Sequence, residues 1–103
     1  MTIAAVLSYK VQPTELGYEY LKRIRYAVPY EALFREGLCP IGAYLIPFVD
    51  RLGGAFAWVP FAEEPVKGMV YVRIPYPADP SRIYRVGENG ELETVTREVN
   101  EDN

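Results

Sequence analysis

The chain contains no histidine and only one cysteine, Cys39, among its 103 residues. Histidine is the usual general base near neutral pH and the commonest metal ligand in proteins. A single cysteine excludes an intramolecular disulfide and a zinc site built from cysteines. We therefore expect no catalytic site, no metal and no cofactor, and we expect Cys39 to be buried as a small apolar residue.

Long apolar runs are also missing. No stretch approaches the roughly 20 apolar residues that cross a bilayer, and the short run at 3–7 lacks the preceding basic residues of a signal peptide. One unpaired thiol is typical of a reducing compartment. These features favour a cytoplasmic protein that does not bind membranes.

Carboxylates are the remaining groups from which an active site could be built. Asp50, Glu63, Glu64 and Asp79 all fall in predicted turns. Two of them could act as a general acid and a general base, but turn carboxylates commonly accept hydrogen bonds from the local backbone instead. A small carboxylate-dependent enzyme therefore stays as the second alternative function.

Aromatic residues are plentiful, and proline precedes an aromatic ring four times, each time after valine or isoleucine. Because proline lacks a backbone donor, each one inside a central strand would remove a ladder hydrogen bond. We therefore expect Pro47, Pro60 and Pro75 at strand ends, at bulges or on edges rather than all inside central strands. The four tripeptides are Val28-Pro29-Tyr30, Ile46-Pro47-Phe48, Val59-Pro60-Phe61 and Ile74-Pro75-Tyr76.

The first part of the chain combines two periodicities. Residues 3–11 alternate between apolar and polar positions, which predicts a strand with one buried face. Residues 14–28 carry apolar side chains at helical spacing, with Thr14 as the N-cap and basic residues late in the segment. Pro29 ends this helix. The segment also alternates weakly, so a strand stays as the alternative.

The rest of the chain is mostly typical of β structure. A second short helix is expected over 30–36, with Gly37 closing it. Short apolar runs at 41–46, 55–59 and 69–74 predict three strands separated by turns.

The C-terminal part predicts a β-hairpin with a three-residue loop, in which Gly90 takes the left-handed position and Gly87 lies opposite Glu91. This register places compatible side chains opposite each other, whereas a two-residue turn would oppose like charges. The expected pairs are Val86 with Leu92, Arg85 with Glu93, Tyr84 with Thr94 and Ile83 with Val95.

Together these elements predict an α+β domain over residues 1–97. Its antiparallel sheet has about five to six strands, including an N-terminal strand, and one longer and one short helix pack on one face in the order β-α-α-β-β-β-β-β. An acidic tail follows at 98–103 and is expected to be frayed.

The aromatic side chains are the best candidates for a binding surface. Aromatic residues make up 14% of the chain, more than one small core needs, so some are expected to be exposed as rigid anchors for another protein. Burial beneath the loops is the alternative interpretation. The candidate partner-binding residues are Tyr30, Phe48, Trp58, Phe61 and Tyr76.

Nucleic-acid binding is the first alternative function. The polar side of the predicted helix mixes tyrosines with basic residues, which can stack on bases and neutralise phosphates. The net charge of −3 argues against it, because nucleic-acid-binding domains usually carry a basic excess. The candidate residues are Tyr18, Lys22, Arg23, Arg25 and Tyr26.

The sequence thus favours a small non-enzymatic protein that assembles with copies of itself or docks onto a larger macromolecule through an aromatic, proline-edged surface. Accessory subunits, phage or viral structural proteins and protein inhibitors have this profile.

Overall fold

The structure is a computed structural model that describes residues 11–24, 27–50, 52, 56–63, 65–75, 79 and 81–95. Within these residues one helix accompanies eight antiparallel strands, which supports the α+β class. The elements are β1 (Val11–Pro13), α2 (Glu15–Leu21), β2 (Val28–Pro29), β3 (Glu36–Pro40), β4 (Tyr44–Asp50), β5 (Phe56–Ala62), β6 (Met69–Arg73), β7 (Tyr84–Val86) and β8 (Leu92–Thr94).

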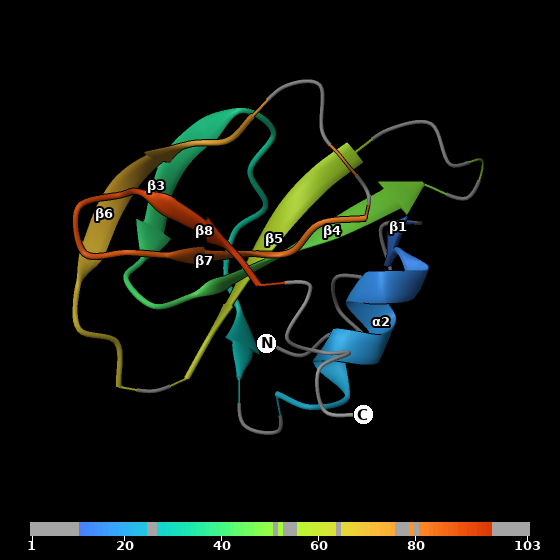
Figure 1. The fold of residues 1–103 in the computed structure, drawn as a ribbon, viewed down its shortest axis with the longest axis horizontal. Helices are drawn as coiled ribbons and strands as arrows, with labels where there is room; N and C mark the ends of the chain where they lie inside the picture. Colours follow the sequence, from blue (N-terminus) through green and yellow to red (C-terminus); the bar gives the residue numbers. More distant parts are fainter. Residues whose placement is uncertain are drawn as a thin grey trace.

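The strands form a main sheet and a separate two-stranded ribbon. The main sheet has the order β2-β5-β4-β7-β8. Strand β7 pairs with the beginning of β4, and β1 pairs with its end. Strands β3 and β6 form the β3–β6 ribbon. Figure 1 shows this ribbon and α2 on opposite sides of the β4–β5 pair.

Strand alternation divides the interior into two clusters. On one face of the main sheet, Leu45 and Trp58 pack with Cys39 and Val72, which come from the inner face of the β3–β6 ribbon. On the other face, buried side chains pack beneath α2. The members of this second cluster are Tyr20, Ile46, Phe48, Val59, Phe61, Ile83 and Val95.

The expected placement of Pro47 and Pro60 is wrong, because both lie inside central strands. The Pro47 carbonyl accepts a hydrogen bond from Thr14 N (3.0 Å), and the Pro60 carbonyl accepts one from Tyr30 N (2.8 Å). In an antiparallel strand the N–H and C=O of one residue point to the same edge. Each proline therefore points away from the β4–β5 ladder, and its missing donor removes no bond between these two strands. Pro75 is exposed and follows the end of β6.

The first helix is shorter than the sequence predicts. Its N-cap is confirmed, because Thr14 Oγ1 accepts a hydrogen bond from Gly17 N at 3.1 Å. The helix ends at Leu21 rather than continuing to residue 28, and Val28–Pro29 pairs instead with the edge of β5. Pairing with the sheet overrides the helical pattern of this segment.

The predicted helix over 30–36 is wrong. Leu33 and Trp58 exchange two backbone hydrogen bonds of 2.7 Å, so the chain crosses the edge of β5 in extended form and enters β3 at Glu36. Gly37 lies within β3 and ends no helix. Helix-starting and helix-ending signals cannot reveal this non-local pairing.

The later strands agree more closely with the sequence. Strands β4, β5 and β6 overlap the three predicted runs, although β4 begins at Tyr44 rather than at residue 41. The hairpin register is confirmed, with a 2.8 Å bond from Gly87 N to Glu91 O and Val86 opposite Leu92. The predicted strand over 3–11, apart from Val11 in β1, and the tail at 98–103 lie outside the described residues.

We expect Gly90→Ala to destabilise the protein more than Gly42→Ala. Both glycines have φ near +90°, where a side chain costs roughly 1–2 kcal/mol. A Cβ at Gly90 would also lie 2.5 Å from Tyr71 O, whereas a Cβ at Gly42 would meet nothing within 4 Å. Urea unfolding of both variants measures the difference, and equal losses would contradict the close contact between the hairpin turn and β6.

Candidate functional site

Three of the five predicted anchor residues are buried rather than exposed. Phe48, Trp58 and Phe61 are each at most a few per cent accessible, so they form no surface in this fold. Tyr30 is half-buried and packs against the cluster beneath the β3–β6 ribbon, and Tyr76 lies outside the described residues. The alternative interpretation of burial is correct for these three side chains.

The tripeptides explain this burial. In a strand the residues on either side of a proline share one face, so Ile46 and Phe48 point the same way, as do Val59 and Phe61. Both pairs face α2, and the rings of Phe48 and Phe61 stack with centroids 6.3 Å apart. In β4 and β5 the repeated pattern therefore builds a core.

Exposed apolar side chains gather elsewhere, on the outside of the β3–β6 ribbon. Leu38 is 61% exposed, Met69 49% and Tyr71 54%, and Phe34, two residues before β3, is 65% exposed. These are four of the six large exposed hydrophobic side chains within the described residues. They make this surface the strongest candidate for partner binding.

Strand pairing sets the geometry of this surface. Leu38 lies directly opposite Tyr71, and Glu36 lies directly opposite Arg73, while Val72 points inward and is buried. We call the outward set the ribbon face. It consists of Glu36, Leu38, Met69, Tyr71 and Arg73.

A polar trio borders the apolar part of the ribbon face. Glu36 Oε1 lies 3.6 Å from Arg73 Nε, and the Tyr71 hydroxyl donates a hydrogen bond to the Glu36 carboxylate. That bond, followed by desolvation and the negative charge of Glu36, raises the pKa of Tyr71. The tyrosine is therefore held as a neutral donor with its ring exposed.

The sequence analysis missed the ribbon face because it placed a helix just before β3. A usable signal was present in residues 69–73, which are apolar at every position except the last. Such a strand either lies between two covered faces or exposes apolar side chains on one of them. The β3–β6 ribbon packs on the main sheet with one face only, so the apolar side chains on its other face are exposed.

The helix surface proposed for nucleic-acid binding is only partly described. Tyr18, Lys22 and Arg23 are exposed, and Lys22 Nζ lies 5.6 Å from the centroid of the Tyr18 ring. Glu19 shares this surface, with its carboxylate 3.6 Å from Lys22 Nζ. Arg25 and Tyr26 lie outside the described residues. An ion pair with Glu19 leaves Lys22 less able to neutralise a phosphate.

Two of the four turn carboxylates bond to nearby groups. Asp50 accepts from Leu52 N at 3.0 Å, and Asp79 accepts from both the backbone N–H and the hydroxyl of Ser81. The Ser81 hydroxyl, followed by its backbone N–H, lowers the pKa of Asp79. Glu63 is exposed, and Glu64 lies outside the described residues.

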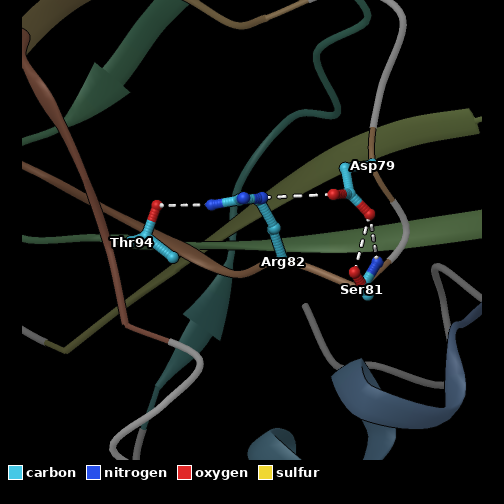
Figure 2. A network of polar contacts seen from close by, with 4 residues as sticks. All are labelled: Asp79, Ser81, Arg82 and Thr94. Atoms are coloured by element: carbon cyan, nitrogen blue, oxygen red, sulfur yellow. Dashed lines mark hydrogen bonds and ion pairs between the residues drawn. The ribbon is translucent and has the colours of Figure 1, made fainter.

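Asp79 belongs to a small network of polar contacts. This network connects β8 with the turn that precedes β7. Figure 2 shows Arg82 between Asp79 and Thr94, with Nε 3.1 Å from Asp79 Oδ2 and Nη1 3.4 Å from Thr94 Oγ1. Among the described residues, the Asp79 carboxylate contacts only Ser81 and Arg82, both within three residues of it in the chain. The arrangement orders a turn and offers no pair of carboxylates for acid–base catalysis.

A cavity of about 390 Å3 opens beside the β7–β8 hairpin, with Tyr44 and Phe61 among its apolar lining. The Arg85 guanidinium lies over the Tyr44 ring at 5.2 Å, and Glu93 lies opposite Arg85 across the strands. Cavities of this size can hold small ligands. Its carboxylates come from exposed residues, and one of them, Glu93, is the residue opposite Arg85. They are Glu63, Glu88 and Glu93.

Among the described residues, no group of three histidine, cysteine or acidic side chains could hold a metal ion. Cys39, the one thiol, lies on the inner face of the β3–β6 ribbon and is buried, as expected. Burial raises the pKa of this thiol from 9.0 to about 12.

We expect Phe48→Ala to destabilise the protein by about 3–5 kcal/mol, because it removes a buried ring and leaves a cavity. Phe34→Ala serves as the matched control. Its ring is mostly exposed, so the expected change is within about 0.5 kcal/mol. Urea unfolding followed by tryptophan fluorescence measures both, and similar losses would show that the two rings are not divided between core and surface.

We expect the Cys39 thiol to resist modification at pH 8 in the folded protein. The thiolate is the reactive form, and raising the pKa from 9.0 to about 12 lowers its fraction about a thousandfold. Burial of the neutral thiol contributes fully to the free energy of unfolding below pH 9. This contribution is lost as the pH rises from 9 to about 12, because the unfolded state then releases the proton more readily than the folded state.

A disulfide reagent such as Ellman's reagent measures the rate of this modification. Leu52→Cys adds an exposed thiol as the control, which should react at once while Cys39 reacts only after unfolding. Rapid release of two equivalents from the folded variant would contradict the burial.

Comparison of the chain with models of protein families, with curated proteins and with solved structures finds no match in any of the three. Of the helical residues that the structure describes, none belongs to a helix long and apolar enough to span a bilayer.

Proposed function

We propose that the protein is a small non-enzymatic binding and assembly protein and that the ribbon face is its protein-binding surface. One observation carries the proposal: Leu38, Met69 and Tyr71 share one side of two paired strands, and each exposes about half or more of its area. Isolated exposed hydrophobic residues need no explanation, but a contiguous group on a small domain commonly marks an interaction site.

The composition of the ribbon face supports a protein partner. Aromatic residues, methionine and arginine are the types enriched at protein interfaces, and the face holds Tyr71, Met69 and Arg73. Arginine at the rim can pair with a carboxylate of the partner. The β3–β6 pairing fixes the backbone positions of these residues before binding, which lowers the entropy cost of association.

Nucleic acid is less well supported as the partner. Glu36 lies between Tyr71 and Arg73, so a phosphate near this arginine would also approach a carboxylate. The net charge of −3 adds a general repulsion of polyanions. The buried thiol Cys39 is compatible with action in the cytoplasm, as an accessory subunit, an inhibitor or a structural protein of a phage or virus.

The double variant Leu38→Lys/Tyr71→Lys tests the proposal. Two charges at the centre of the ribbon face should abolish partner binding, because moving charged side chains out of water into an apolar interface is costly. Tagged wild type and variant are immobilised, incubated with an extract of the native source and compared by quantitative mass spectrometry. We expect at least a tenfold loss of the retained partner with the variant.

Tyr18→Lys/Leu52→Lys is the matched control, since it adds the same charge at exposed apolar residues outside the ribbon face. The control should retain the partner, and urea unfolding should show both variants folded. If the ribbon-face variant keeps the partner as well as the control does, the proposed surface is wrong.

A further inference from the structure

We infer that the ribbon face binds a second copy of this chain, stacked face to face across a two-fold axis. The axis runs parallel to the strands, over the midline between β3 and β6, in the plane that separates the two stacked ribbons. The inference rests on the proposed function, because it names the partner of the same surface. It follows from which residues lie opposite each other in the β3–β6 ribbon.

The two-fold operation exchanges the strands. An axis in the plane between two stacked ribbons places β3 of one copy over β6 of the other at the same height. Each of the residues Glu36, Leu38, Tyr71 and Arg73 therefore meets the copy of its own cross-strand partner, whereas the partner of Met69 is the buried Pro40 at the end of the ribbon. Leu38 meets Tyr71 of the second copy, and Glu36 meets Arg73 of the second copy.

This register makes the surface complementary to itself. The apolar pair Leu38–Tyr71 gives two apolar contacts across the axis, and the opposite charges of Glu36 and Arg73 give two ion pairs. A ribbon with like charges opposite each other would repel its own copy. Since Glu36 Oε1 is already 3.6 Å from Arg73 Nε, the two pairs would merge into one network of alternating charges.

In the described part of the chain, the outward side chains Leu38, Met69 and Tyr71 stay exposed and can be covered by stacking. The inner face packs on the main sheet through Cys39 and Val72, and α2 lies on the far side of that sheet. Face-to-face sheets pack about 10 Å apart with interdigitating side chains. Projecting side chains such as Leu38 and Tyr71 can fill a layer of that thickness.

The size of the patch predicts a weak dimer. Aromatic side chains bury roughly 150–250 Å2 each. With Leu38, Met69 and Tyr71 taken as about this large and about half exposed, the patch offers on the order of 300 Å2. Stable complexes commonly bury about 800 Å2 per partner. The dimer should therefore form and dissociate with protein concentration, so it has to be measured over a concentration series.

Charge reversal distinguishes a contact between chains from one within a chain. Arg73→Glu leaves two acidic residues on the ribbon face, and Glu36→Arg leaves two basic residues. Each variant repels its own copy, so we expect each alone to be a monomer. An equimolar mixture places acidic against basic residues at both sites and should restore the dimer as a heterodimer, although the ion pair within each chain stays broken.

Sedimentation velocity of wild type, each variant and the mixture measures these masses, and native mass spectrometry identifies the heterodimer. The matched control is Glu19→Lys mixed with Lys22→Glu, which reverses another exposed ion pair of 3.6 Å on α2. These two proteins should dimerise like wild type, separately and mixed. Urea unfolding checks that every variant is folded.

A wild type that stays monomeric at the highest concentration, or a mixture that stays monomeric, would overturn the inference. The proposed function has a separate outcome. If the chain is a monomer but the Leu38→Lys/Tyr71→Lys variant loses a different captured protein, the ribbon face binds proteins and only its partner has been named wrongly. Salt-sensitive binding of a single-stranded oligonucleotide, lost in that variant while the wild type is a monomer, would assign the face to nucleic acid instead.

Discussion

The hydrogen-bonding direction of proline is the constraint on which the rest of this fold depends. Pro47 and Pro60 lie in neighbouring central strands, yet both turn their missing donors away from the ladder that joins those strands. Thr14 N donates to Pro47 O, but proline returns no bond, so Thr14 O is left to accept from Tyr18 N at 2.8 Å. The proline in β4 thus ends the pairing of β1 and frees the carbonyl with which α2 begins.

The same constraint acts at the other edge of the sheet. Tyr30 N donates to Pro60 O, and since proline returns no bond, β2 ends at Pro29. The aromatic residue after each proline lies on the face of the sheet opposite to the proline ring. Phe48 and Phe61 therefore come together beneath α2. A Cβ on Gly17 would lie 2.7 Å from Ile46 Cγ2, so only glycine lets α2 approach β4 this closely.

How much the sequence predicted depends on the range of each interaction. The N-cap at Thr14 and the hairpin around Gly90 were predicted because their bonds join residues close in the chain. The second helix was wrong because Leu33 bonds to Trp58, far away in sequence. The anchors Phe48, Trp58 and Phe61 were misplaced for a related reason. Proline was read as ending its own strand, whereas Pro47 and Pro60 end the neighbouring ones, and the rings beside them lie in the core.

The ribbon face follows from a shortage of layers. The central strands β4 and β5 are covered on one side by α2 and on the other by the β3–β6 ribbon, so most of their alternating side chains are buried on both faces. The ribbon has only its inner face covered, and Leu38, Met69 and Tyr71 face outward without a further layer from the described residues. Apolar side chains on a rigid outer strand pair cost free energy in water, and a protein layer would remove that cost. Because Glu36 already lies opposite Arg73, a second ribbon provides such a layer with its charges correctly placed.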